Sequence, residues 1–133
     1  MALLDEKTLA FLKERRFGVL ATIGSSHIPQ QTVMWYDIAD GMVLMNTAAG
    51  RVKEKNMRKN PVISLCVEEG YRFVTLVGKA ELIDDQAVAQ EDIKRLAIRY
   101  NGPEAAQSQV EAFMKEQRIS IHMHIDRVFA NID

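Results

Sequence analysis

Short apolar segments separated by tight turns are the feature that most limits how this chain can fold. The segments Gly18–Ile23, Gln30–Ile38 and Met42–Met45 have the length and residue types of β-strands. A small-residue turn at Gly24-Ser25-Ser26 joins the first two, and Asp40-Gly41 between the second and third is typical of a hairpin. Connections this short join antiparallel neighbours, so we predict an antiparallel sheet rather than a parallel one.

The rest of the chain predicts further strands and four helices. Strands are predicted at Val62–Val67, Arg72–Ile83 and Arg118–Phe129. Gly78 inside the second of these predicts a bulge or a close approach of two backbones. Short strands, tight turns and flanking helices together indicate an α+β protein with an antiparallel barrel. The helices are predicted from apolar spacing, caps and breakers, at Asp5–Arg16, Val52–Arg58, Asp84–Tyr100 and Ala106–Gln117.

Length and composition limit the class of protein. The 133 residues predict a single domain, 1–133, that is large enough to bury a core. A content of 47% apolar and 26% charged residues is that of a soluble globular protein. No apolar run is long enough to cross a membrane, and the N-terminus is too charged for a signal peptide, so we predict a cytoplasmic protein with no membrane partner. The single cysteine, Cys66, lies in an apolar strand and is predicted to be an inert thiol.

Positive charge is concentrated in the stretch Asn46–Pro61, where five basic side chains stand against one acid. A local basic block in a chain of net charge −1 indicates an anion site, whereas a nucleic-acid partner would need a more basic domain and is not predicted. The order strand, small-residue turn at Thr47–Gly50, helix predicts a phosphate at the helix N-terminus, with Arg51 and Lys53 adding full charges. The alternative is a solvated basic helix.

The chain carries no motif for catalysis by the protein alone. A nucleophile elbow, a Walker loop, a dinucleotide glycine fingerprint and zinc-ligand spacing are all missing, so no catalytic residue is predicted and a bound cofactor would carry the chemistry. His122 and His124 share a strand face with Asp126, but a polar outer face explains them and no metal is predicted. Trp35 and Tyr36 suit core packing or a dimer interface, or else a wall beside a flat ring.

The order of these features resembles the pyridoxamine 5′-phosphate oxidase-like superfamily of flavin- and deazaflavin-binding split β-barrels. The resemblance rests on the strands GVLATI, QQTVMWY and VISLCV, the Asp-Gly hairpin and the segment T-x-x-GR-x-K-x-x-N-M-R-x-NP. It runs from about Arg16 to Ile83, with a looser match at Arg118–Val128. The most similar branch is the small B group of reductases that depend on the deazaflavin coenzyme F-420. This implies an antiparallel, FMN-binding-like split β-barrel flanked by short helices, and a homodimer with cofactor sites at the subunit interface.

Site residues follow from the same resemblance. Arg51 and Lys53 match the basic pair that binds the cofactor phosphate, and Thr47, Ala48 and Gly50 match the loop beside it. Asn56 of the following helix matches a family asparagine that ties the helix to the barrel, and Met45 and Asn46 match the strand end beside the loop. The strand that lies along the ring is matched by Gln30, Thr32, Val33 and Met34; the candidates to complete the site from the partner subunit are Tyr71, Arg72 and Arg118.

The resemblance implies hydride transfer between a bound coenzyme F-420 and a small electron-poor substrate such as an enone, a quinone or a tetrapyrrole. Two alternatives remain open: an FMN-dependent oxidoreductase on the same scaffold, and a non-catalytic flavin-binding or carrier protein. The basic side chains of Lys55, Arg58 and Lys59 favour the longer anionic tail of F-420 over FMN, which ends at its phosphate. The additional arginine and histidine pattern of pyridoxal phosphate binding is missing, so activity as a vitamin oxidase is not implied.

Overall fold

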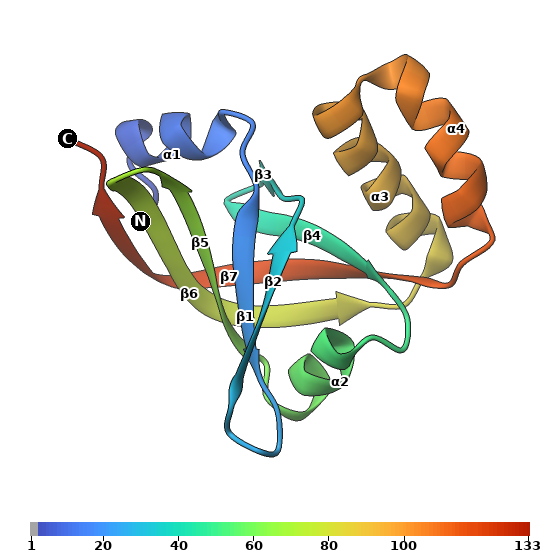
Figure 1. Cartoon of the computed structure of the whole chain (residues 1–133), viewed down its shortest axis with the longest axis horizontal. Coiled ribbons are helices and arrows are strands. Elements are labelled where there is room, and N and C mark those ends of the chain that lie inside the picture. Colours follow the sequence, from blue (N-terminus) through green and yellow to red (C-terminus); the bar gives the residue numbers. More distant parts are fainter. Residues whose placement is uncertain (1–2) are drawn as a thin grey trace.

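The computed structural model describes residues 3–133. Its seven strands form one antiparallel sheet in the order β2-β1-β5-β6-β7-β4-β3 (Figure 1). The predicted α+β class and the antiparallel sheet are therefore confirmed. The helices are α1 (Glu6–Lys13), α2 (Val52–Lys59), α3 (Gln86–Asn101) and α4 (Pro103–Met114). The strands are β1 (Gly18–Ile23), β2 (Pro29–Met34), β3 (Asp37–Ala39), β4 (Met42–Ala48), β5 (Val62–Glu69), β6 (Arg72–Ile83) and β7 (Arg118–Asn131).

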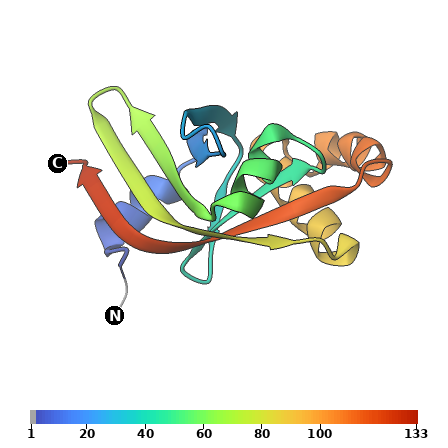
Figure 2. The same cartoon turned by 90° about the horizontal axis from the view of Figure 1, so that it is seen from below.

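The long β6–β7 ladder runs through the whole molecule and bends within it (Figure 2). Its register shifts between Val77 and Gly78, where the sequence predicts a bulge or a close approach. A Cβ atom on Gly78 would lie 1.9 Å from the carbonyl oxygen of His124, so only glycine fits there. At the two ends of the sheet, β2 and β3 each pair with a single strand, and no ladder of residues 3–133 joins them. Closure into a barrel remains a prediction.

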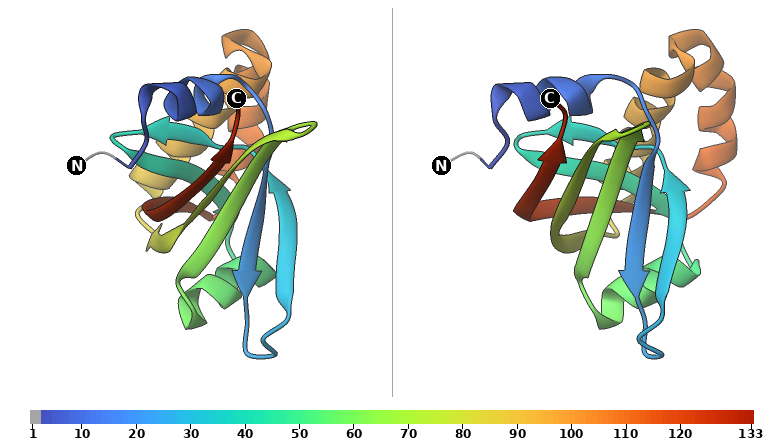
Figure 3. Two further views of the ribbon diagram at one scale, coloured as in Figure 1. Left: turned by 90° about the vertical axis from the view of Figure 1, so that its left-hand side faces the viewer. Right: turned by 60° about the vertical axis from the view of Figure 1, so that its left-hand side comes forward.

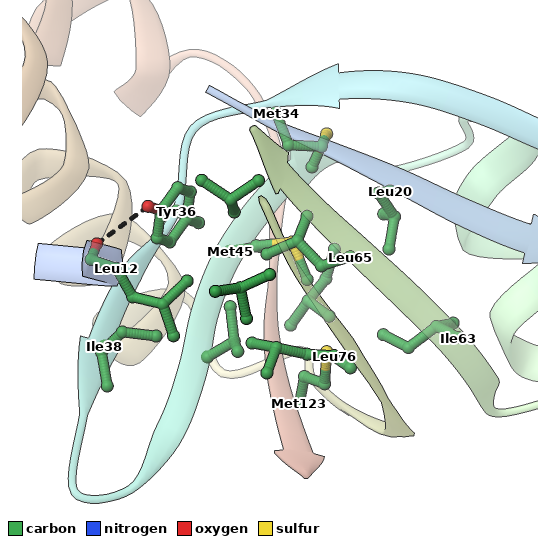
Figure 4. Packing of buried hydrophobic residues seen from close by; sticks show 14 of the residues in the cluster. Leu12, Leu20, Met34, Tyr36, Ile38, Met45, Ile63, Leu65, Leu76 and Met123 are labelled. Carbon is green, nitrogen blue, oxygen red and sulfur yellow. Dashed lines mark hydrogen bonds between the residues drawn. The ribbon is translucent and has the colours of Figure 1, made fainter. Parts of the chain in front are cut away.

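The core lies inside the bent sheet and under α1 (Figure 4). Leu20, Leu65, Leu76 and Met123 point into it from four different strands and are almost fully buried. Tyr36 is also buried, and its hydroxyl donates a hydrogen bond of 2.8 Å to the carbonyl oxygen of Leu12 in α1. Burial raises the pKa of Tyr36 to about 12, so the phenol stays protonated and remains a donor at neutral pH.

Two predicted strands differ from the observed ones by more than two residues at an end. The predicted strand Gln30–Ile38 is interrupted at Trp35-Tyr36 and forms two strands, because the backbone N–H of Tyr36 donates to the hydroxyl of Tyr100, 3.1 Å away, instead of to a neighbouring strand. The predicted strand Met42–Met45 continues to Ala48, because all of it from Val43 onwards pairs with β7. Both differences come from contacts with distant parts of the chain, which local sequence patterns do not contain.

The helices cover different parts of the sheet. α3 and α4 form a hairpin in which α3 packs on β4 and β7, whereas α1 lies across one end of the sheet and α2 lies near the other (Figures 1 and 3). Asp5 caps α1 as predicted, with its carboxylate accepting from the backbone N–H of Thr8 at 2.7 Å. Among residues 3–133, no helix combines the length and apolarity that membrane crossing requires.

Replacement of Gly78 by alanine tests the close approach of β6 and β7. The new methyl group would overlap the His124 carbonyl, so Gly78→Ala is expected to lower the free energy of unfolding by about 2 kcal/mol. The exposed neighbour Lys79 gives the matched control, because Lys79→Ala is expected to change stability by less than about 0.5 kcal/mol. Urea denaturation of both variants measures the difference, and equal stabilities would contradict the packing described.

Candidate functional site

The corner where β4 turns into α2 carries the basic stretch. The strand ends at Ala48, and Gly50 makes the turn with a φ of 91°, a conformation that favours glycine. Thr47 was predicted to belong to the turn, but it lies within β4, opposite Ile119 of β7. The same ladder places Arg118 directly opposite Ala48. The end of β4, the start of β7 and the start of α2 therefore meet.

Three cations gather at this corner. Lys53 is buried, with 7% of its surface exposed, and its ammonium has no hydrogen bond or ion pair to any residue in 3–133. Burial lowers the pKa of Lys53, and the positive charges of Arg51 and Arg118 lower it further. Burial also lowers the pKa of the Arg118 guanidinium, against the opposing effect of Glu116. An anion bound here would relieve the repulsion among these cations.

The first turn of α2 already contains a carboxylate, that of Glu54. Arg51 is the N-cap residue and makes no side-chain capping bond. Glu54 accepts the backbone N–H of Gly50 at 2.6 Å and also pairs with Arg58 at 2.7 Å. Both donors lower the pKa of Glu54 and keep it negative. The positive potential for an anion therefore comes from the side chains of the three cations more than from the helix end.

A hollow of about 260 Å³ on the side of α3 and α4 is lined by one of these cations, Arg118. Arg118 contributes its charge to this hollow, and its guanidinium lies 5.0 Å from the centre of the Phe113 ring. The indole of Trp35, another wall, is stacked on Tyr100 with ring centres 5.2 Å apart. A flat, partly polar molecule suits such a lining. The lining residues are Val33, Met34, Trp35, Asn46, Ile93, Leu96, Phe113 and Arg118.

The predicted polar residues of β2 are joined to α2 by a chain of hydrogen bonds. Asn56 donates to the hydroxyl of Thr22 at 3.1 Å, and Thr22 donates to the amide oxygen of Gln30 at 3.2 Å. The amide nitrogen of Gln30 then donates to Thr32 at 3.1 Å. Asn56 also packs closely on Gly24, where an added Cβ atom would lie 2.4 Å from its side-chain oxygen. This geometry supports the predicted role of Asn56 in tying the helix to the sheet.

Most of the other predicted residues separate into two sets, and Met45 and Thr47 belong to neither. Asn46, Val33 and Met34 line the hollow, and Ala48, Gly50, Arg51 and Lys53 lie at the corner of cations. Met45 belongs to the hydrophobic core and is fully buried, as expected for a neighbour of Asn46 that points to the opposite side of β4. The Thr47 hydroxyl is also enclosed and has a single weak contact, 3.4 Å to the carbonyl oxygen of Ala48.

Several residues of the hollow were not predicted from the sequence. Arg118 was considered only as a residue of a partner subunit, yet it lies in the same chain beside Asn46, to which its Nε donates at 2.9 Å. Tyr71 and Arg72, the other two such candidates, lie at the exposed turn between β5 and β6. Phe113 was taken only as part of a helix. Its amphipathic helix was recognisable in the sequence, but the approach of that helix to Arg118 of β7 was not.

Comparison with known proteins identifies relatives of nearly full length. The family model for pyridoxamine 5′-phosphate oxidase matches residues 4–131. An F-420-dependent biliverdin reductase of Mycobacterium tuberculosis is 25% identical over 132 residues, which cover 98% of this chain and 90% of that protein. The crystal structure of a conserved hypothetical protein of Mycobacterium tuberculosis has a TM-score of 0.83 at 28% identity, covering 97% of this chain and 85% of the other.

A structure described as an F-420 reductase has a TM-score of 0.73 at 21% identity, covering 90% of this chain and 94% of the other. At that identity the similarity establishes the fold alone.

The unpaired charge of Lys53 makes a prediction for the ligand-free protein. Replacement by an apolar side chain removes a largely enclosed charge, so Lys53→Met is expected to raise the free energy of unfolding at pH 7 by up to about 1 kcal/mol. Because the folded state lowers the pKa of Lys53, the penalty is complete below that pKa and disappears as the pH rises towards the ordinary value of 10.5. The gain from Lys53→Met should shrink over the same range.

Thermal and urea denaturation between pH 7 and pH 10 measure this gain. The matched control is Lys55→Met, which changes an exposed lysine of the same helix and should give little gain at any pH. A destabilised Lys53→Met protein at pH 7 would refute the idea that the charge opposes folding.

Proposed function

The chain belongs to the pyridoxamine 5′-phosphate oxidase family, and from this premise we propose that it is an oxidoreductase that uses the deazaflavin coenzyme F-420. Its substrate would be a small electron-poor molecule such as an enone, a quinone or a tetrapyrrole. The observation that carries the proposal is the largely enclosed side chain of Lys53, whose ammonium has no counter-charge in residues 3–133 and is repelled by Arg51 and Arg118, the latter a lining residue of the hollow. An enclosed cation without a counter-charge fits a ligand that brings a negative charge.

In this proposal the two ends of the site have different tasks. Arg51 and Lys53 would hold the phosphate of the coenzyme. Val33, Met34 and Trp35 would form one wall for its ring, and Asn46 would face its polar edge. When bound, the reduced deazaflavin supplies the hydride. The protein then has to bind the ring, orient it and keep water from it, which agrees with a chain that has no catalytic motif.

F-420 is preferred to FMN because the relative described as a biliverdin reductase depends on F-420. The local charge supports this preference less than the sequence suggested. Arg58 is engaged by Glu54 and Asp84, both at 2.7 Å, so it is neutralised. Only Lys55 and Lys59 of that helix are left for a longer anionic tail. An FMN-dependent oxidoreductase, or a flavin carrier, would use the same corner of cations.

Loss of the two phosphate-binding cations should abolish tight binding of the coenzyme. Each charge-assisted contact contributes about 1.5–3 kcal/mol, so Arg51→Ala combined with Lys53→Ala is expected to weaken affinity for F-420 and for FMN by more than about tenfold. Fluorescence titration measures both affinities. The control variant, Lys79→Ala combined with Lys94→Ala, removes two exposed charges elsewhere and should bind nearly as the unmodified protein does. Equal affinities in the two double variants would exclude the assigned phosphate site.

We further propose that the protein is a homodimer that covers the outer face of β1, β2 and β5. In Figure 3 (right) no helix of residues 3–133 lies in front of these strands. The hollow is also smaller than the about 300 Å³ at which ligand pockets usually begin, which suits a site completed by a second subunit. One cross-strand row of this face is made of small and apolar residues that are exposed or half-buried, Val33, Val19 and Cys66, and the row continues to Thr75 of β6.

A charge placed on this face should separate the subunits. Ala21 lies on the same outer side of β1, between Gln31 of β2 and Ser64 of β5. Ala21→Arg is expected to convert a dimer into a monomer, because an interface excludes an unpaired charge. Ala87→Arg on the exposed side of α3 is the matched control and should leave the dimer intact. Analytical ultracentrifugation measures the oligomeric state of all three proteins. If the unmodified protein sediments as a monomer, the proposed dimer is refuted.

A further inference from the structure

A line of hydrogen bonds connects Arg118 of the hollow to helix α3. The Nε of Arg118 donates to the side-chain oxygen of Asn46 at 2.9 Å, and the side-chain nitrogen of Asn46 donates to the hydroxyl of Ser120 at 3.3 Å. The Ser120 hydroxyl in turn donates to a carboxylate oxygen of Asp92. The Nε2 of His122 lies 2.9 Å from that same oxygen. The line therefore begins at an acid of α3 and ends at a guanidinium of the proposed binding site.

The donor and the acceptor of every hydrogen bond in this line follow from its two end groups, the carboxylate of Asp92 and the guanidinium of Arg118. An ionised carboxylate only accepts, so Ser120, which has one proton, must donate it to Asp92 and accept from Asn46. The nitrogen of Asn46 also donates to the backbone carbonyl of Ala89 at 2.9 Å, which can only accept. The side-chain oxygen of Asn46 is thereby turned towards Arg118, whose guanidinium can only donate.

Burial makes these bonds hard to replace. Ser120 is fully buried, and Asn46 and Arg118 are 7% and 8% exposed. In such surroundings water does not easily substitute for a missing partner, and an unsatisfied group is costly. A change at Asp92 should therefore be transmitted along the line to Arg118.

We propose that Asp92 is a positioning residue that, through Ser120 and Asn46, orients the Nε edge of the Arg118 guanidinium, whose Nη1 is held separately by Glu116 at 3.1 Å. The consequence for ligand binding rests on the proposed function, in which the hollow beside Arg118 holds the ring of an anionic coenzyme. His122 supports Asp92 as a second donor to the same oxygen. Asp92 itself does not line the hollow on which Arg118 acts.

If Asp92 acted on the ligand only through its charge, its replacement would change the affinity in the opposite direction. Its negative charge repels an anionic ligand, so removal of that charge should by field alone tighten binding at the cationic corner. Removal of a positioning residue should weaken binding, because Arg118 loses its preferred orientation. The sign of the change in affinity therefore separates the two explanations.

The chain contains a matched control for the Asp92–His122 pair. His124, two residues further along β7, lies 2.9 Å from the carboxylate of Glu81 on β6. This pair has the same chemistry, but it is exposed and has no bond to Asn46 or Ser120 among residues 3–133. Glu81→Gln should therefore disturb a histidine–carboxylate pair without reaching Arg118.

The first experiment uses the ligand-free protein, so its result does not depend on the proposed function. Proton–nitrogen NMR spectra record the Nε–H signal of Arg118, assigned by its loss in Arg118→Lys. In Asp92→Asn and Ser120→Ala this signal is expected to move towards that of solvent-exposed arginines, and in Glu81→Gln it should stay in place. Ser120→Ala keeps every charge, so it carries the test if Asp92→Asn does not fold. An unmoved Arg118 signal in a folded Ser120→Ala protein overturns the proposal.

The second experiment measures affinity for F-420 and for FMN by fluorescence titration. Asp92→Asn and Ser120→Ala are each expected to weaken binding about three- to tenfold, and Glu81→Gln to leave it unchanged. Tighter binding by Asp92→Asn, or unchanged affinity despite a moved Arg118 signal, would overturn the role in binding. If the unmodified protein bound neither coenzyme, the proposed function would fail, and the NMR result alone would then decide whether Asp92 orients Arg118.

Discussion

The pairing of β4 with β7 holds three cations together although they repel one another. The ladder sets Arg118 opposite Ala48, and the turn at Gly50 brings the start of α2 to the same corner. The side chain of Lys53 is largely buried there without a counter-charge in residues 3–133, and both burial and the neighbouring cations lower its pKa. A fold does not gain stability from such an arrangement. The rest of the sheet must therefore supply the stability that this corner costs, which is typical of a binding site.

Much of the secondary structure was predictable, because its determinants are local. The bounds of β1 and β6 follow directly from apolar runs and turn residues, and the bulge follows from Gly78. The break after β2 was missed, because it depends on a hydrogen bond from Tyr36 to Tyr100, which lies 64 residues further along the chain. Sequence patterns indicate that a segment is extended, but not which distant side chain takes its backbone N–H away from the sheet.

The candidate site was predictable only in part, for the same reason. Arg51 and Lys53 lie in one short segment, so their charge is visible in the sequence. Trp35 was considered from the sequence as a wall beside a flat ring, but Arg118 of β7 and Phe113 of α4 reach the same hollow only after β4 pairs with β7 and the helical hairpin packs on that pair. The face of β7 with Ser120 and His122 was predicted to be an outer polar face. It is instead covered by α3, which contributes Asp92 to both side chains.

The two histidine–carboxylate pairs of β7 show that surroundings matter more than residue type. His124 and Glu81 lie at the surface, where solvent screens the pair and either partner can turn to water. His122 and Asp92 are mostly enclosed, and the acid also accepts from the fully buried Ser120. Only the enclosed pair is connected by hydrogen bonds to a residue of the hollow, Arg118. Enclosed polar groups are hydrogen-bonded to other protein groups rather than to water, so their bonds form connected lines. Through such a line of hydrogen bonds, a residue outside the proposed binding site, Asp92, influences the orientation of a residue that lines it, Arg118.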